Sequence, residues 1–175
     1  GAGLAGLVVS RKLARSYDVV LFEKSRGVGG RMATRRAGPF QFDHGAQFFT
    51  AQTRAFRTFL EPLIEAGIVA GWPARFAELR RDQVAGKRQW DNEHPHYVGV
   101  PGMNAIGKAL ASGLDVRLDT AVTSLGRTGK RWRLVGDGQS PLGEFDWVIV
   151  TAPAAQAADL LASTSIASAA ERVRM

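Results

Sequence analysis

The stretch GAGLAGLVVSRKLARSYDVVLFEKSRGVGGR, residues 1–31, decides the fold of this chain. Its first six residues form a complete GxGxxG motif, and the apolar spacing that follows predicts a helix over residues 4–15. The short apolar run at residues 18–22 predicts a buried strand of a parallel sheet, which ends at Glu23. Glycine loop, helix, strand and terminal acid together indicate a nucleotide-binding βαβ unit.

Each part of this unit has a physical role in holding a nucleotide. Gly1 permits a tight turn, Gly3 lets the backbone approach a pyrophosphate, and Gly6 lets helix and strand pack closely. The amides at the start of the helix favour phosphate oxygens. Glu23, 17 residues after Gly6, can accept hydrogen bonds from both ribose hydroxyls and disfavours a 2′-phosphate. A turn that holds no ligand is the alternative interpretation.

A second glycine loop follows at once. Glu23 and Gly29-Gly30-Arg31 read as E-x5-GGR, in which the glycines let the main chain approach a ligand and Arg31 can pair with phosphate oxygens. A nicotinamide dehydrogenase does not need this loop, whereas an enzyme that holds FAD extended across two loops does. A flexible turn with a surface arginine is the alternative.

Composition and charge limit the classes of protein to which this chain can belong. The chain has 175 residues, 45% of them hydrophobic, and no cysteine, which excludes a disulfide scaffold, a thiolate metal site and a cysteinyl-linked cofactor. The lack of cysteine is compatible with a reduced, cytoplasmic location, which we expect. No segment reaches the roughly 20 apolar residues that cross a bilayer, so we expect no membrane partner. The net charge of +7 comes from scattered residues, which favours a solvated surface over nucleic-acid binding.

The rest of the chain shows weaker patterns. We expect a helix over residues 52–67 that Pro62 kinks or splits near Glu61, irregular structure over 71–96, and a helix over 104–112 closed by Gly113. Alternation predicts short antiparallel strands around Val116 and Leu118, Val122 and Leu125, and Trp132 and Leu134. Residues 145–151 are expected to form a buried strand, followed by a helix to Leu161.

The chain resembles the FAD-dependent oxidoreductases of the flavin amine oxidase superfamily, and within it the bacterial renalase-like proteins. The resemblance is carried by GAGLAG at 1–6, FEKSRGVGGRMATRR at 22–36, DHGAQFFT at 43–50, YVGVPGMNAIGKAL at 97–110 and FDWVIVTAPAAQAADLL at 145–161. The segments at 43–50 and 97–110 narrow it to the renalase-like proteins. Because no strand precedes the glycine loop, and because such proteins are about twice as long, we expect this chain to be truncated at both ends.

The resemblance implies noncovalent FAD and a set of contact residues. The implied cofactor residues are Gly1, Gly3, Leu4, Ala5, Gly6, Glu23, Lys24, Gly29, Gly30, Arg31, Gly45, Ala46, Val122, Thr151 and Ala152. Gln47, Phe48, Phe49 and Thr50 would border the substrate cavity over the flavin, although both phenylalanines could equally be core residues. No catalytic residue is identified, and no metal site is expected because His44, His94 and His96 are scattered.

The predicted fold is α/β: a Rossmann-like FAD-binding domain, residues 1–50 and 98–155, with an inserted α+β substrate domain that includes 51–97 and 156–175. The resemblance implies an oxidase that takes a hydride from dihydronicotinamide dinucleotide isomers onto flavin N5 and passes electrons to oxygen, giving hydrogen peroxide. An amine oxidase or a desaturase is the first alternative. A noncatalytic nucleotide-binding module or a basic nucleic-acid binder is the more distant one.

Overall fold

The computed structural model describes residues 1–90, 93, 95–162 and 164, and these fall into two compact units. Unit 1 contains Gly1–Gly30 and Leu110–Met175, and unit 2 contains Arg31–Ala109. The units therefore divide the chain differently from the expected domains: residues 31–50 and 98–109 group with unit 2, and residues 156–162 with unit 1. The assignment of the expected domains to FAD and substrate binding stays a prediction.

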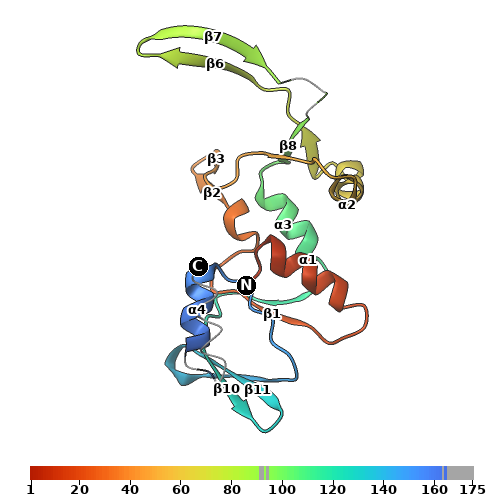
Figure 1. The fold of residues 1–175 in the computed structure, drawn as a ribbon, viewed down its shortest axis with the longest axis vertical. Coiled ribbons are helices and arrows are strands. Elements are labelled where there is room, and N and C mark those ends of the chain that lie inside the picture. The colour runs from red at the N-terminus through yellow and green to blue at the C-terminus, as the bar shows by residue number, and fades with distance from the viewer. Residues whose placement is uncertain (91–92, 94, 163, 165–175) are drawn as a thin grey trace. The chain divides into compact units, whose positions relative to one another are not determined.

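Unit 1 begins with the expected glycine loop, helix and strand. Helix α1, Leu4–Leu13, leads to β1, Val20–Phe22, which ends immediately before Glu23. Strand β1 pairs in parallel with β9, Asp115–Arg117, so the antiparallel strand expected around Val116 is wrong. Helix α3, Asn104–Ala111, precedes β9 along the chain, and most of it groups with unit 2. Helix α1 and strand β1, labelled in Figure 1, form with β9 the Rossmann-like part of the α/β fold.

An antiparallel sheet forms the second part of unit 1. It has the order β10–β11–β12, with β10 at Val122–Thr128, β11 at Arg131–Gly136 and β12 at Pro141–Phe145. The hairpins expected around Leu125 and Leu134 are confirmed, and both of these leucines are buried. The 3-10 turn η2, Asp137–Gln139, joins β11 to β12.

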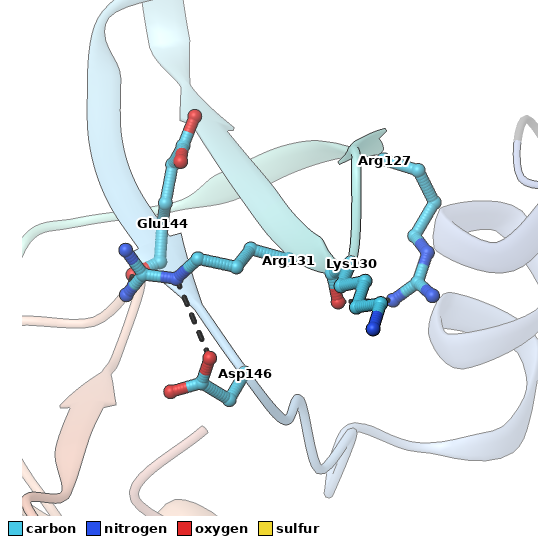
Figure 2. Close-up of polar contacts among 5 residues, drawn as sticks. All are labelled: Arg127, Lys130, Arg131, Glu144 and Asp146. Atoms are coloured by element: carbon cyan, nitrogen blue, oxygen red, sulfur yellow. Dashed lines mark hydrogen bonds and ion pairs between the residues drawn. The ribbon is translucent and has the colours of Figure 1, made fainter.

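Basic side chains stabilise this sheet at the β10–β11 turn. Figure 2 shows the ion pair between Arg131 Nε and Asp146 Oδ1, which lie 3.5 Å apart. Arg127 donates to the carbonyl of Lys130 over 3.1 Å, and its guanidinium lies 4.7 Å from the centre of the Trp132 ring. Part of the positive charge of the chain is therefore structural.

The buried strand expected over residues 145–151 is wrong. Strand β12 ends at Phe145, and residues 147–150 have no strand structure, with Trp147 86% exposed and Ile149 56% exposed. An extended segment is a strand only when its amides hydrogen-bond to a neighbouring strand. Among the described residues β1 pairs only with β9, so it does not provide that partner for residues 147–150. The expected helix that follows is present as α4, Ala154–Ala162, which buries Ala157 and Ala158.

Unit 2 contains small sheets, the amphipathic helix α2 and most of α3. Its elements are η1 (Gly30–Met32), β2 (Thr34–Ala37), β3 (Phe40–Asp43), β4 (Phe49–Thr50), α2 (Arg54–Glu65), β5 (Val69–Gly71), β6 (Arg75–Arg80), β7 (Gln83–Gln89) and β8 (His96–Gly99). Strands β4 and β5 both pair antiparallel with β8, whereas β2–β3 and β6–β7 are separate hairpins. Figure 1 shows β6 and β7 as a long two-stranded ribbon.

Two sequence expectations fail within unit 2. Residues 71–96 were expected to be irregular, but most of them form β6, β7 and the ends of β5 and β8. Helix α2 is continuous through Pro62, so the split near Glu61 is wrong. Proline removes one intrahelical amide, and only three helical residues follow Pro62, so few further hydrogen bonds depend on it.

Asp43 connects the two segments that narrow the family resemblance. Its Oδ1 and Oδ2 each accept the amide of Met103 over 3.1 Å, and the Thr34 hydroxyl donates to Oδ1. The amide of Asn104 in turn donates to that hydroxyl oxygen over 3.2 Å. These bonds satisfy backbone donors at the start of α3, as an N-cap does. The hydrogen bonds of this helix cap therefore connect the segment 43–50 to the segment 97–110.

In the part of the chain that the structure describes, none of the helices has the length and apolar content needed to span a membrane.

Candidate functional site

The first glycine loop places open backbone at the start of α1. Gly3 is the N-cap of this helix and receives no side-chain cap, and a Cβ built on Gly3 would meet nothing within 4 Å. Leu4, Ala5 and Gly6 form the first turn, whose amides have no partner within the helix. A Cβ on Gly6 would lie 2.0 Å from the carbonyl oxygen of Gly1, so this position accepts only glycine. Close packing at Gly6 therefore fixes the start of the helix, while the open space at Gly3 leaves the first amides accessible to an anion.

The second glycine loop is hydrogen-bonded to the first. The amide of Gly29 donates to the carbonyl of Ala2 over 2.8 Å, and Gly3 and Gly29 form a parallel β-bridge. Gly29 and Gly30 have φ values of 109° and 55°, which favour glycine. A Cβ on Gly30 would lie 3.2 Å from the Cα of Gly3. The two loops therefore form one continuous backbone surface.

Glu23 lies beside these loops and is only 8% exposed. Its Oε2 accepts the amide of Ala2 over 2.7 Å, and its Oε1 accepts the amide of Ser25 over 2.9 Å. Burial of the carboxylate raises its pKa, but the hydrogen bonds from Ser25 and Ala2 outweigh burial and hold the pKa of Glu23 below its usual value. Glu23 is therefore an ionised acceptor in a fixed orientation, as a ribose-binding acid requires.

Hydrogen bonds of unit 1 also involve the neighbours of Val122 and Ala152, and Lys24 itself. The amide of Thr120, two residues before Val122, donates to the carbonyl of Glu23 over 2.9 Å. The hydroxyl of Thr151, next to Ala152, donates to the carbonyl of Gly1 over 3.0 Å. The exposed Lys24 Nζ donates to Gln156 Oε1 on α4 over 3.1 Å.

Within unit 2, the structure brings together Arg31, Gly45 and Ala46. The amide of Ala46 donates to the carbonyl of Arg31 over 2.9 Å. A Cβ on Gly45 would lie 2.1 Å from that same carbonyl oxygen, so the backbone of residue 45 must be glycine. The contact of this pair with a flavin stays a prediction.

The four predicted substrate residues have three kinds of surroundings. Phe49 is half-buried and packs against Tyr97 and Phe56, with ring centroids 5.7 and 5.9 Å away, so it is a packing residue of its sheet. Gln47 and Thr50 are exposed. Phe48 is 38% exposed and lies in a group of aromatic rings that sequence reasoning missed: Trp72, Trp90 and His96. The only signal for this group was the frequency of aromatic residues between 72 and 97.

Metal ligands do not gather in the described residues, where no group of three or more His, Asp or Glu side chains could hold an ion. His44 is exposed, His96 belongs to the aromatic group, and His94 lies outside the described residues.

The residues of unit 1 fit an adenine dinucleotide. A helix start without a side-chain cap can receive phosphate oxygens, and the open space at Gly3 leaves room for them. Glu23 presents an ionised carboxylate next to this space for ribose hydroxyls. Arg31 follows directly on the second loop and can add positive charge.

Two family models match this chain. Residues 1–63 match the family model of the NAD(P)-binding Rossmann-like domain, and residues 60–175 match that of the flavin-containing amine oxidoreductases. The chain belongs to the flavin-containing amine oxidoreductase family. FAD is the cofactor that these matches indicate.

Solved structures show the same fold at low sequence identity. A fatty acid isomerase from P. acnes matches with a TM-score of 0.70 and 12% identity, over 94% of this chain and 60% of that protein. A candidate protoporphyrinogen oxidase from Exiguobacterium sp. 255-15 matches with a TM-score of 0.67 and 14% identity, over 93% of this chain and 60% of that protein. A triple mutant of putrescine oxidase matches with a TM-score of 0.66 and 13% identity, over 95% of this chain and 59% of that protein. The chain thus spans about 60% of the length of these proteins.

Proposed function

We propose that the whole protein is an FAD-dependent oxidase of the renalase-like group, which oxidises dihydronicotinamide dinucleotide isomers. The observation that carries the FAD part is the hydrogen bond between the two glycine loops beside the buried Glu23. A single glycine loop is common to many nucleotide-binding proteins, whereas a joined pair offers backbone to an extended dinucleotide. The chemistry that bound FAD supplies is acceptance of a hydride at N5 followed by reoxidation with oxygen, which yields hydrogen peroxide.

The chain's own residues would hold the cofactor at three places. The amides of Leu4, Ala5 and Gly6 would bind phosphate oxygens, and Arg31 would neutralise their charge. Glu23 would accept the hydroxyls of the adenosine ribose, with its own orientation fixed by Ala2 and Ser25. Gly45 and Ala46 would present backbone to the flavin end.

Two features support a dinucleotide as the hydride donor. The segments at 43–50 and 97–110 resemble renalase-like proteins, and the Asp43 cap joins them. The net charge of +7 also favours an anionic substrate. Loss of a hydride from a dihydropyridine needs no general base, which agrees with a site for which no catalytic acid or base is identified.

An amine oxidase is the second candidate. The family description names amine oxidoreductases, and the fold is similar to that of putrescine oxidase. The +7 charge of this chain would make the approach of a protonated amine electrostatically less favourable than that of a dinucleotide.

The test uses the purified full-length protein. We expect it to be yellow, to release FAD on denaturation, and to have its flavin bleached by dihydronicotinamide isomers under anaerobic conditions faster than by amines. Admission of oxygen should then restore the colour and produce hydrogen peroxide. A colourless protein that takes up no FAD contradicts the whole proposal. A yellow protein that amines bleach faster supports the amine oxidase instead.

A further inference from the structure

Three hydrogen bonds from separate segments of unit 1 hold the backbone of the first glycine loop. The amide of Ala2 donates to Glu23 Oε2 over 2.7 Å, and the carbonyl of Ala2 accepts the amide of Gly29 over 2.8 Å. The third bond runs from the hydroxyl of Thr151 to the carbonyl of Gly1 over 3.0 Å. The peptide group between Gly1 and Ala2 is therefore held at both its oxygen and its nitrogen.

The carbonyl of Gly1 is in close contact with the start of α1. A Cβ built on Gly6, in the first turn, would lie 2.0 Å from the Gly1 carbonyl oxygen and 2.9 Å from Thr151 Oγ1. Gly6, the Gly1 carbonyl and the Thr151 hydroxyl are thus packed against one another, since a side chain on Gly6 would overlap both of the other groups. The orientation of the Gly1 carbonyl and the position of the first helical turn are therefore set together.

Of the three partners that hold the loop, only Thr151 lies outside residues 1–30. It is 150 positions from Gly1 in the sequence, between the segment 147–150, which has no strand structure, and α4. Helix α4 begins at Ala154 and buries Ala157 and Ala158, so the chain is anchored directly after Thr151. The geometry of the glycine loop consequently depends on a residue that the βαβ pattern does not include.

The bond to Gly1 also limits what Thr151 can do for a phosphate group. A threonine hydroxyl has a single proton, and Thr151 donates it to the Gly1 carbonyl. An ionised phosphate only accepts hydrogen bonds, so Thr151 has no proton for it while this bond is intact. The amides of Leu4, Ala5 and Gly6, by contrast, are donors without a partner in the helix. Thr151 is therefore suited to hold the loop, and these amides are suited to receive the phosphate.

A loop that is held before binding retains its ligand better than a loose one. Ordering a flexible segment on binding costs free energy, and prior ordering removes that cost. Glycine has the most backbone freedom to lose, and Gly1 and Gly3 flank Ala2 in this loop. The hydrogen bond from Thr151 thus acts at a point where backbone restraint has a large effect.

We propose that Thr151 is a positioning residue for FAD. Through the Gly1 carbonyl it holds the amides of Leu4, Ala5 and Gly6 where they receive phosphate oxygens, and it does not itself bind the phosphate. This inference rests on the proposed contact between these amides and FAD.

The rate of FAD release from the full-length holoenzyme, followed as the rise in flavin fluorescence after dilution, tests this role. Thr151→Val keeps the shape of the side chain but removes the hydroxyl, and it should release FAD about fivefold faster, as expected for the loss of one hydrogen bond. Thr151→Ser keeps the hydroxyl and should stay within about twofold of wild type. Thr123→Val is the matched control, because the Thr123 hydroxyl also donates to backbone carbonyls, those of Val135 and Gly136. It should leave FAD release unchanged.

Hydrogen exchange at the Gly29 amide measures the loop itself in the FAD-free full-length protein. Because this amide donates to Ala2, it should exchange about fivefold faster in Thr151→Val than in wild type, and Thr151→Ser should leave it unchanged.

Faster FAD release with unchanged Gly29 exchange would indicate direct contact and would contradict the positioning role. The role is also contradicted if Thr151→Val releases FAD no faster than Thr123→Val, or if Thr151→Ser releases it as fast as Thr151→Val. A wild-type protein that binds no FAD would contradict the proposed function, while the Gly29 exchange would still show whether Thr151 holds the loop.

Discussion

The substitution Glu23→Gln tests the role of the buried carboxylate. Glu23 accepts two backbone amides, from Ala2 at 2.7 Å and from Ser25 at 2.9 Å. Glutamine has the same shape, but its NH₂ group must face one of these amides, so two donors meet and one is left unpaired in an 8% exposed position. A buried unsatisfied donor costs about 1–3 kcal/mol, so the free energy of unfolding should fall by about 2 kcal/mol.

The effect should also depend on pH. The pKa of Glu23 is held below its usual value in the folded protein, so the carboxylate contributes stability that is present above the unfolded pKa of about 4.3. That contribution is lost as the pH falls through the folded pKa. The difference in stability between wild type and Glu23→Gln should therefore be full at neutral pH and shrink below about pH 4.

Thermal unfolding of the purified full-length protein at several pH values is the measurement. Unfolding entropy is about 2.1 cal/mol/K per residue, so in a full-length protein about twice as long as this chain a loss of about 2 kcal/mol corresponds to a fall in Tm of about 3 °C at neutral pH. Glu144→Gln is the matched control, because Glu144 is exposed in the same unit and should change Tm by less than about 1 °C. FAD retention should fall about tenfold in Glu23→Gln, since the ribose loses a charged acceptor. A Tm and flavin content equal to wild type would refute the reasoning.

Three further substitutions test other parts of the structure. Gly6→Ala places a Cβ 2.0 Å from the Gly1 carbonyl oxygen and should lower stability by about 3 kcal/mol or more, whereas Gly126→Ala, with nothing within 4 Å, should have little effect in the same urea unfolding experiment. Asp43→Ala removes the acceptor for the Met103 amide and should cost about 1–2 kcal/mol, measured against Asp82→Ala at the β6–β7 turn; equal stability of the two variants would argue against the cap. Arg31→Gln should lower the flavin content of the purified protein with little change in Tm, and Arg26→Gln serves as the control; unchanged flavin content in Arg31→Gln would remove Arg31 from the cofactor site.

The nucleotide-binding unit could be predicted from the sequence because its residues act locally. Spacing alone places Gly6 against the start of α1 and Glu23 at the end of β1, and the structure has both there. Helix α3 was equally predictable, since Met103, Ile106 and Leu110 follow helical spacing and are buried.

The errors occur where pairing with a distant segment decides the structure. Residues 147–150 have the composition of a buried strand, yet none of the strands in the described part of the chain pairs with them. Strand β9 is too short to reveal from its own residues that its partner is β1. In the β6–β7 ribbon both faces are largely exposed, so no apolar alternation marks the strands, and Leu79 and Val84 remain 68% and 54% exposed.

The hydrogen bond from Gly29 to Ala2 limits how this protein can be re-engineered. The acceptor is the carbonyl of Ala2, so any loop that replaces the first one must place a backbone carbonyl at the same point to pair with the Gly29 amide. A chimera that transfers residues 1–31 as one segment keeps both partners of this bond. A graft of residues 1–15 alone keeps it only where the incoming loop follows the same backbone path.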